Sequence, residues 1–249
     1  MRASVVVPRD RAEEATARML VLFPEGFAEE SGPDTVELAA FTDERGARRL
    51  RESFAHVRTV PVPPGWEEEW KRFHVPVVVG SLWIGPPWEL PPEELTPVVI
   101  DPGRAFGTGS HPTTRLCLGF LHELQRGSAL DLGCGSGVLA IAAVKLGFAP
   151  VIAVDDDEAA IDATHVNADR NGVELEVRQA DALADPLPET ALVLANIDLR
   201  TLTALAPKLR CRLVLTSGYS ESESLSVAGF RRLIRRTDEE WAADLFARE

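Results

Sequence analysis

The sequence predicts an α/β protein, in which a small α+β domain precedes a larger Rossmann-like domain with a mostly parallel sheet. Three observations favour this fold class. Residues 1–63 show strand and helix patterns in the order β-α-β-β-α-β, which is typical of a ferredoxin-like sandwich. A tract rich in Pro and Trp follows. From residue 97 onward, strands alternate with helices, and repeated βα units indicate a parallel sheet with right-handed crossovers.

Composition and charge limit the possible partners. The 249 residues, of which 45% are apolar, suffice for one large domain or for a medium and a small one. The net charge of −13 argues against direct binding of nucleic acid, because such binding depends on clustered Lys and Arg. The charge fits a small-molecule substrate or a basic protein partner, and it fits equally well a surface that serves solubility alone.

Cysteine usage and apolar runs bear on location. The chain has three cysteines, Cys117, Cys134 and Cys211, without CxxC or metal-ligand spacing, so we expect reduced thiols and no metal. The N-terminal stretch lacks an apolar region with a cleavage site, and no apolar run reaches the length of a membrane span. We therefore expect a cytoplasmic protein without a membrane partner, and we expect it to be a monomer.

The domain boundaries follow from these patterns. For the ferredoxin-like domain, residues 1–63, we favour substrate docking over a purely stabilising role. Residues 64–96 are predicted to form a Pro-rich linker, in which Trp66 and Trp70 share one face of a short helix. Residues 97–249 form the predicted larger domain.

Each element of the larger domain has its own signal. The stretch VVIDPG (98–103) predicts its first strand, and TTRLCLGFLHEL (113–124) predicts a helix with Ser110 as a possible N-cap. The apolar run SALDLG (128–133) predicts a strand that is buried on both faces, and further strand patterns follow it. These strands are expected at 128–133, 150–155, 175–181, 190–197 and 212–218, with helices at 136–147, 157–172 and 199–209 between them. Residues 217–249 allow a last helix and a hairpin.

A glycine-rich turn and an acidic residue lie where ligands bind in open parallel sheets, beyond the carboxyl ends of the strands. The turn DLGCGSG (131–137) lets the backbone approach a ligand without an intervening Cβ. Val138 stands where the GxGxxG pattern requires its third glycine, which argues against a nicotinamide cofactor. Asp155 closes the next strand, where a carboxylate can accept hydrogen bonds from both ribose hydroxyls. Asp181 ends the following strand, near a possible adenine edge, and Asp156 and Asp157 are expected to face solvent or to cap the next helix.

Four long segments carry a family resemblance. The segments LDLGCGSGVLAIAAVKLG (130–147) and VIAVDDDEAAIDATHVNADRNGV (151–173) resemble class I S-adenosylmethionine-dependent methyltransferases. More narrowly, WEEEWKRFHVPVVVGSLWIGPPW (66–88) and DPGRAFGTGSHPTTRLCL (101–118) resemble the PrmA-type methyltransferases of large-subunit ribosomal protein eleven. The resemblance implies a seven-stranded, mostly parallel sheet and S-adenosyl-L-methionine as cofactor.

The resemblance also implies which residues form the site. In that family the counterparts of Thr114, Gly133, Asp155 and Asn196 contact the cofactor. The loop FGTGSHPTT (106–114) is similar to a cofactor lid, in which Phe106 covers the ligand. His111 is a candidate proton acceptor, although a loop hydrogen bond is its commoner role. The full set of candidate cofactor-binding residues is Phe106, Gly107, Thr108, Thr114, Asp131, Gly133, Gly135, Gly137, Asp155, Asp181 and Asn196, and Asn196 is also the candidate catalytic residue.

The expected acceptor of the methyl group is an amine. Related methyltransferases have N-P-P-[YF] after the fourth strand, where the aromatic ring stacks on a planar acceptor, but this chain has NIDL (196–199). This favours an amine over a planar acceptor, and the family resemblance implies a protein N-methyltransferase that acts on lysine or N-terminal amines of a large-subunit ribosomal protein. Asp198 departs from the family pattern, and either a contact to a cationic substrate or a changed specificity fits it. The alternatives are methylation of another protein or a small amine, and a cofactor-binding module without turnover.

Overall fold

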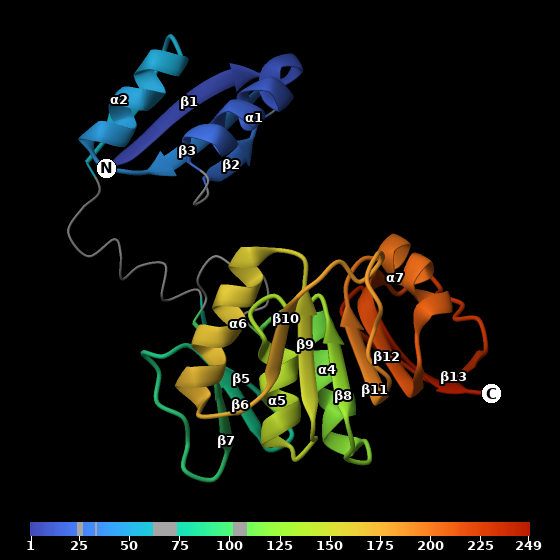
Figure 1. The fold of residues 1–249 in the computed structure, drawn as a ribbon. Coiled ribbons are helices and arrows are strands. Elements are labelled where there is room, and N and C mark those ends of the chain that lie inside the picture. The colour runs from blue at the N-terminus through green and yellow to red at the C-terminus, as the bar shows by residue number, and fades with distance from the viewer. Residues whose placement is uncertain (24–26, 33, 62–73, 102–108) are drawn as a thin grey trace. The chain divides into compact units, whose positions relative to one another are not determined.

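The computed structural model of the protein describes residues 1–23, 27–32, 34–61, 74–101 and 109–249 (Figure 1). The chain divides into two compact units, Met1–Arg72 and Phe73–Glu249. In the described parts of both units, no helix has the length and apolar character needed to cross a membrane.

The N-terminal unit is the predicted ferredoxin-like sandwich. Its elements are β1 (Arg2–Pro8), the 3-10 turn η1 (Arg9–Arg11), α1 (Ala12–Leu22), β2 (Ala28–Ser31), β3 (Thr35–Phe41), α2 (Glu44–Ser53) and β4 (Arg58–Val60). The strands pair in the order β2-β3-β1-β4, and every pairing is antiparallel. Met19 and Phe23 from the first helical segment pack with Leu38 and Leu50 in a core made of residues of this unit alone.

The larger unit contains the seven-stranded sheet. Its strands are β8 (Ala129–Leu132), β9 (Val151–Asp155), β10 (Glu176–Gln179), β11 (Thr190–Asn196), β12 (Cys211–Ser220), β13 (Phe230–Asp238) and β14 (Trp241–Arg248), in the order β10-β9-β8-β11-β12-β14-β13. The first five in this order run parallel, whereas β14 pairs antiparallel with both β12 and β13. This topology confirms the predicted Rossmann-like fold.

Helices cover both faces of this sheet. One buried cluster unites the sheet with α4 (Pro112–Glu123), α5 (Val138–Lys145) and α6 (Glu158–Asn171), and the other contains α7 (Leu199–Leu205) and the 3-10 turn η3 (Ala206–Lys208). The six buried residues of α5 are all apolar or small, from Val138 to Ala143. A helix so apolar is expected to lie between other elements rather than at the surface.

Three predictions about the larger unit need correction. The strand expected at 98–103 is β7 (Thr96–Val99), and it pairs with β6 (Leu82–Gly85) in a separate three-stranded sheet with β5 (Val77–Val79) instead of joining the main sheet. The side chain of Asn171 on α6 occupies the backbone groups of Val99, accepting from its N–H at 2.9 Å and donating to its carbonyl. Two strands of this small sheet also fall within the segment predicted as linker.

The third correction concerns the end of the chain. Residues 217–249 contain the expected hairpin, β13–β14, but no helix. The stretch between β12 and β13 is rich in Ser and Glu and offers few apolar residues at helical spacing, although Leu225 and Val227 are buried there. The predicted helix around Trp66 and Trp70 lies outside the described residues.

Candidate functional site

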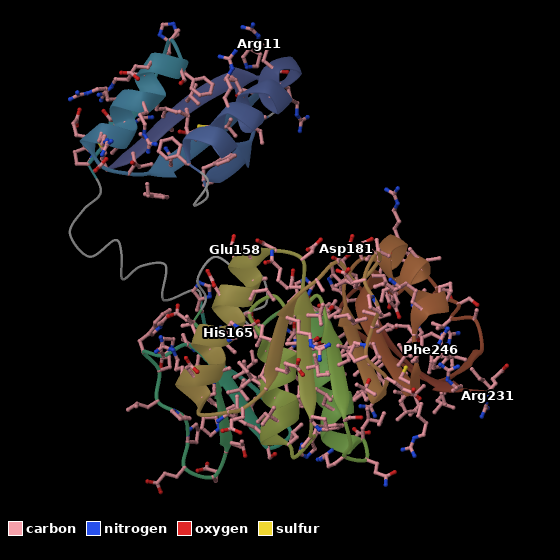
Figure 2. All side chains as sticks on the ribbon, viewed as in Figure 1. Arg11, Glu158, His165, Asp181, Arg231 and Phe246 are labelled. Carbon is pink, nitrogen blue, oxygen red and sulfur yellow. The ribbon has the colours of Figure 1, made fainter. Side chains whose placement is uncertain are left out.

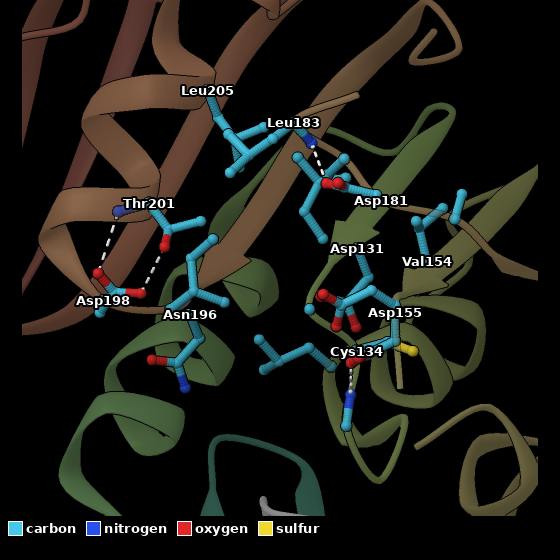
Figure 3. A pocket seen from close by; sticks show the side chains of 18 of the residues that line it. Asp131, Cys134, Val154, Asp155, Asp181, Leu183, Asn196, Asp198, Thr201 and Leu205 are labelled. Carbon is cyan, nitrogen blue, oxygen red and sulfur yellow. Dashed lines mark hydrogen bonds between the residues drawn. The ribbon is translucent and has the colours of Figure 1, made fainter. Parts of the chain in front are cut away.

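A cavity of about 420 Å³ opens at the carboxyl ends of the parallel strands (Figure 3). It is bordered by the last residues of β8, β9 and β11 and by the turns after β8, β9, β10 and β11, together with one residue of α4, two of α5 and two of α7. Its lining comprises Thr114, Asp131, Leu132, Gly133, Cys134, Gly135, Val138, Leu139, Val154, Asp155, Asp156, Ala180, Asp181, Ala182, Leu183, Asn196, Ile197, Asp198, Thr201 and Leu205. Seven of the candidate residues named from the sequence therefore border one cavity: Thr114, Asp131, Gly133, Gly135, Asp155, Asp181 and Asn196.

The glycine-rich turn after β8 has a conformation that side chains would obstruct. Gly133 has φ = 71°, and a Cβ on it would lie 2.4 Å from Cγ2 of Ile197. Its N–H donates to the carbonyl of Val154 at 2.8 Å, which pulls the turn against β9. Gly137, in contrast, does not line the cavity. It is the N-cap of α5 with φ = 79°, and a Cβ there would meet Cγ2 of Thr164 at 2.9 Å.

Asp155 is held in place by backbone N–H groups. At the end of β9, its Oδ2 accepts from the N–H of Gly135 at 3.0 Å, and its Oδ1 accepts from the N–H of Asp157 at 3.1 Å. Each carboxylate oxygen has a further lone pair, so the group can still accept hydrogen bonds from a ligand. Asp157 itself caps α6 by accepting from the N–H of Ala159 at 2.9 Å, and Asp156 is exposed, so each residue takes one of the two expected roles.

Asp131 is the buried carboxyl of the site, with an exposed fraction of 1%. Its pKa is raised to about 7, mainly by burial and also by the negative charge of Asp155, although the hydrogen bond from the Ala140 N–H to Oδ2 (3.0 Å) acts in the opposite direction. A carboxyl with such a pKa exists in both protonation states near neutral pH.

Asp181 lies in the turn after β10, at the wall of the cavity that is away from Asn196. Its Oδ1 accepts from the N–H of Leu183 at 2.8 Å, and its own N–H donates to Oδ2 of Asp185 at 3.0 Å. Figure 2 shows Asp181 and Glu158 at the same end of the larger unit, as expected for residues that follow parallel strands. The turn therefore presents polar groups on the side of the cavity away from Asn196.

Asn196 joins the end of β11 to the first turn of α4. Its Nδ2 donates to Oγ1 of Thr114 at 3.3 Å, and the Thr114 side chain is buried. Figure 3 shows Asn196 and Asp155 on opposite sides of the cavity. A ligand that reached both side chains would span the cavity.

The loop before Thr114 is described from Gly109 onward. His111, rather than Ser110, is the N-cap of α4: its Nδ1 accepts from the N–H of Thr113 at 3.4 Å and lies 2.8 Å from Oγ1 of the same residue. Burial lowers the pKa of His111, and the nearby charge of Arg115 lowers it further, so the imidazole is biased toward its neutral form. The candidates Phe106, Gly107 and Thr108 lie outside the described residues.

Asp198 has a structural partner for each of its carboxylate oxygens. Oδ1 accepts from the N–H of Thr201 at 3.0 Å, and Oδ2 accepts from its hydroxyl at 2.6 Å, so Asp198 is the N-cap of α7. The hydroxyl of Thr201 holds the pKa of this carboxyl below its usual value. Asp198 is nevertheless exposed and lines the cavity, so its negative charge faces anything that enters.

Sequence reasoning missed part of the lining. Leu183 and Leu205 give one wall an apolar character, and Thr201 precedes Leu205 by one helical turn. The i, i+4 spacing of Thr201 and Leu205 could have predicted that both residues lie on the same face of α7. Thr164 does not line the cavity, but it supports the glycine-rich turn and was missed as well: its hydroxyl donates to the carbonyl of Gly135 at 3.0 Å and lies 3.3 Å from Sγ of Cys134. Among the described residues, no group of three His, Cys, Asp or Glu side chains could hold a metal ion.

Comparisons with known proteins show which family the chain is similar to. The sequence model described as "Ribosomal protein L11 methyltransferase (PrmA)" matches residues 28–222. A ribosomal protein L11 methyltransferase of Vibrio cholerae is 41% identical over 198 residues, which cover 76% of this chain and 67% of the relative. One of Shewanella woodyi is 42% identical over 181 residues, which cover 66% of this chain and 60% of the relative.

A solved structure agrees with these sequences. The crystal structure of ribosomal protein L11 methylase from Lactobacillus delbrueckii subsp. bulgaricus superposes with a TM-score of 0.62 and 30% identity, over 68% of this chain and 95% of that one. The chain spans about two thirds or less of the length of the two curated relatives. The match over residues 28–222 nonetheless includes every described residue of the cavity. The chain therefore belongs to the ribosomal protein L11 methyltransferase family, PrmA.

Proposed function

We propose that the protein transfers methyl groups from S-adenosyl-L-methionine to lysine or N-terminal amines of ribosomal protein L11. Membership of a methyltransferase family makes S-adenosyl-L-methionine the methyl donor. One structural observation carries the proposal for the site. A backbone-anchored carboxylate, Asp155, and an amide, Asn196, lie on opposite sides of a cavity that also contains the glycine-rich turn.

The cavity fits the cofactor in size and in chemistry. Its volume of about 420 Å³ falls within the usual range for small-molecule sites. Asp155 can accept hydrogen bonds from the two ribose hydroxyls, because its backbone partners leave lone pairs available. The absence of side chains at Gly133 and Gly135 gives the amino-acid part of the cofactor access to the backbone. Asp181 and the apolar Leu183 border the remaining wall, which suits an adenine ring.

The sulfonium of the cofactor supplies an electrophilic methyl group, so the protein has to align a nucleophile with it. A lysine with a pKa near 10.4 must lose its proton, at about 4.6 kcal/mol at pH 7, whereas an α-amine near 7.8 needs about 1 kcal/mol. Burial near a positive charge lowers the pKa of either amine and reduces this cost. The neutral amine then needs hydrogen-bond acceptors that direct its lone pair.

Asn196 is the proposed acceptor for the incoming amine. Because its Nδ2 donates to Thr114, its Oδ1 is oriented away from that hydroxyl and can accept an N–H of the substrate. Thr114 thus sets the orientation of the amide, and Asn196 sets the orientation of the amine. No residue in this arrangement has to take up the proton in the methyl-transfer step if the amine arrives neutral.

Acidic side chains around the cavity favour a cationic substrate. Asp156, Asp181 and Asp198 line the cavity and are exposed, and the whole chain carries a net charge of −13. Their potential raises the local concentration of a basic protein and accelerates its association at low ionic strength. A basic ribosomal protein fits this environment better than a neutral small amine.

The proposal is tested by incubating the purified protein with methyl-labelled cofactor and unmodified L11, followed by intact-mass and peptide analysis. We expect mass additions in steps of one methyl group on lysine side chains, on the N-terminal amine, or on both. An L11 sample acetylated at all amines is the matched control and should take up no label. Label on acetylated L11, or none on the unmodified protein, would contradict the proposal.

The same assay separates the two alternatives. Asp198, which departs from the family pattern, is the observation that favours a different acceptor, because its exposed charge borders the cavity. Label on other basic proteins or small amines but not on L11 would support that reading. Binding of S-adenosylhomocysteine in calorimetry without label on any acceptor would indicate a module without turnover.

A further inference from the structure

The C-terminal hairpin is attached to α4 by ion pairs near each end of the helix. Near the cavity, Arg115 contacts Asp238 and Glu239 at the tip of the hairpin formed by β13 and β14. Toward the other end of the helix, Glu123 contacts Arg236 of β13, with N–O distances of 3.0 and 2.6 Å. The two arginines are similarly exposed, but their contacts lie at different distances along α4 from Thr114.

The contacts of Arg115 are several and converge. Its Nε donates to Oδ2 of Asp238 at 2.8 Å, its Nη2 donates to Oε1 of Glu239 at 3.0 Å, and its Nη1 donates to the carbonyl of Ser110. The hydrogen bond to Asp238 raises the pKa of the guanidinium above its usual value, and the one to Glu239 adds to this. One planar cation thus connects the hairpin tip with the loop that precedes α4.

Two further features show that the hairpin tip is shaped for this contact. Glu239 has φ = 54°, a conformation that few residues other than glycine adopt. Trp241, at the start of β14, packs edge-on against the ring of His111, with centroids 4.9 Å apart. The tip therefore contacts Ser110 through Arg115 and His111 through an aromatic ring.

Residues 109–111, which Arg115 and Trp241 connect to the hairpin tip, lead directly to the cavity. The carbonyl of His111 accepts from the N–H groups of Thr114 (3.0 Å) and Arg115 (3.1 Å), which starts the helix. Thr114 in turn accepts the hydrogen bond of Asn196 and lines the cavity. A displacement of residues 109–111 would therefore move the Thr114 hydroxyl relative to Asn196.

We infer that Arg115 is a positioning residue, through which the hairpin tip fixes the start of α4 and the Thr114–Asn196 pair at the methyl-transfer site. The inference rests on the proposed function, because it assigns Arg115 to the same site. Arg115 does not line the cavity, so it acts through Thr114 rather than on the ligand. The hairpin, which follows the parallel strands in sequence, thereby helps to hold Thr114 and Asn196 in the orientation that methyl transfer requires.

The second ion pair provides a matched control. Replacing Arg236 by Gln removes a guanidinium that links the same strand to the same helix, with side-chain exposure of 34% against 28% for Arg115. Arg236 also lies 4.3 Å above the ring of Phe120, so its loss should destabilise the hairpin at least as much. An effect that follows only from a loosened hairpin would therefore appear in both variants.

The experiment compares Arg115→Gln, Arg115→Lys and Arg236→Gln in the protein of residues 1–249. Amide hydrogen exchange at residues 109–114 measures the loop without a ligand, and calorimetry with S-adenosylhomocysteine measures cofactor binding. Methylation assays then give kcat and KM. We expect Arg115→Gln to accelerate exchange at 109–114 and to lower kcat about tenfold or more, because a small misplacement of aligned groups reduces rate strongly. Arg115→Lys should restore part of kcat, and Arg236→Gln should leave exchange at 109–114 and kcat within about twofold of the parent.

Two results would overturn the inference. Equal changes in exchange and kcat for Arg115→Gln and Arg236→Gln would show that the ion pair stabilises the hairpin and nothing more. Unchanged exchange at 109–114 in Arg115→Gln would show that the loop does not depend on Arg115, whatever the enzyme assay gives. Failure of the parent protein to bind S-adenosylhomocysteine would instead contradict the proposed function, and the exchange comparison would still decide whether Arg115 holds the loop.

Discussion

Asn196 and Thr114 are 82 positions apart in the sequence, yet the amide of one donates to the hydroxyl of the other at 3.3 Å. The contact joins the end of β11 to the start of α4 at the edge of the cavity. It combines a residue of the parallel sheet with a residue of the loop–helix segment that precedes the sheet in the chain.

Replacement of Asn196 by Ala should lower kcat about 100-fold, the usual effect of removing one positioned hydrogen-bonding group at a reacting centre. Cofactor affinity should change much less, because Asp155 and the glycine-rich turn remain. Steady-state kinetics and calorimetry with S-adenosylhomocysteine measure the two quantities. Thr114→Val should lower kcat as well, whereas Thr114→Ser, which keeps the hydroxyl, should retain most of it. A kcat for Asn196→Ala close to that of the parent would refute the assigned role.

Replacement of Asp155 by Asn should weaken cofactor binding by about 10- to 150-fold, since hydrogen bonds to a charged group contribute about 1.5–3 kcal/mol. The fold should persist, because the amide oxygen of Asn can still accept from a backbone N–H such as that of Gly135. Calorimetry gives the affinity and circular dichroism the fold. Asp156→Asn is the control: it removes an exposed carboxylate from the same rim and should change the affinity only slightly. Similar losses in both variants would point to the overall charge of the rim instead.

Gly133→Ala should abolish cofactor binding and lower the free energy of unfolding by about 2 kcal/mol or more, since both positive φ and crowding are costly. The new Cβ would lie 2.4 Å from Cγ2 of Ile197. Gly172→Ala is the control, because that glycine also has positive φ (61°), but a Cβ added there would have no neighbouring atom within 4 Å. It should cost about 1 kcal/mol and leave binding intact. Denaturant unfolding measures the free energy of unfolding, and calorimetry measures cofactor affinity. Equal losses in Gly133→Ala and Gly172→Ala would contradict the prediction.

Asp131 should make stability depend on pH between about 4 and 7. In the folded protein it keeps its proton up to a pKa of about 7, against 3.8 for the ordinary side chain. The unfolded chain binds fewer protons in this window, so the contribution of Asp131 to stability is complete below pH 4 and declines as the pH rises to 7. Asp131→Asn does not titrate, and its amide oxygen can still accept from Ala140. Its free energy of unfolding relative to the parent should therefore increase over this window, by at most about 4 kcal/mol. A constant difference from pH 4 to 7 would contradict the assignment.

The sequence predicted those cavity residues that lie directly at the carboxyl end of a strand. Gly133, Asp155 and Asn196 each follow a buried apolar run, and parallel strands bring their carboxyl ends to one edge. The chain pattern of the N-terminal unit likewise predicted its topology, because the turns between its elements are short and the patterns are local.

Residues that depend on tertiary packing were not predictable in this way. β7 has the composition of a sheet strand, but the amide of Asn171 takes its backbone groups and the strand pairs with β6. The capping role of Asp198 on α7 was missed although its partner, Thr201, is only three positions away, and its exposed carboxylate still borders the cavity. The bridge from Arg115 to Asp238 spans 123 positions, and no local pattern marks such a pair.

The separate core of the N-terminal unit has a consequence for how the chain denatures. All buried apolar residues of that core belong to Met1–Arg72, and those of the two clusters on the main sheet belong to Phe73–Glu249. Each unit thus has a hydrophobic core built from its own described residues, which allows it to unfold as a cooperative unit of its own. A calorimetric scan should therefore show two heat-absorption peaks, one for each unit. A form of the protein in which only the N-terminal unit is unfolded should keep its affinity for S-adenosyl-L-methionine.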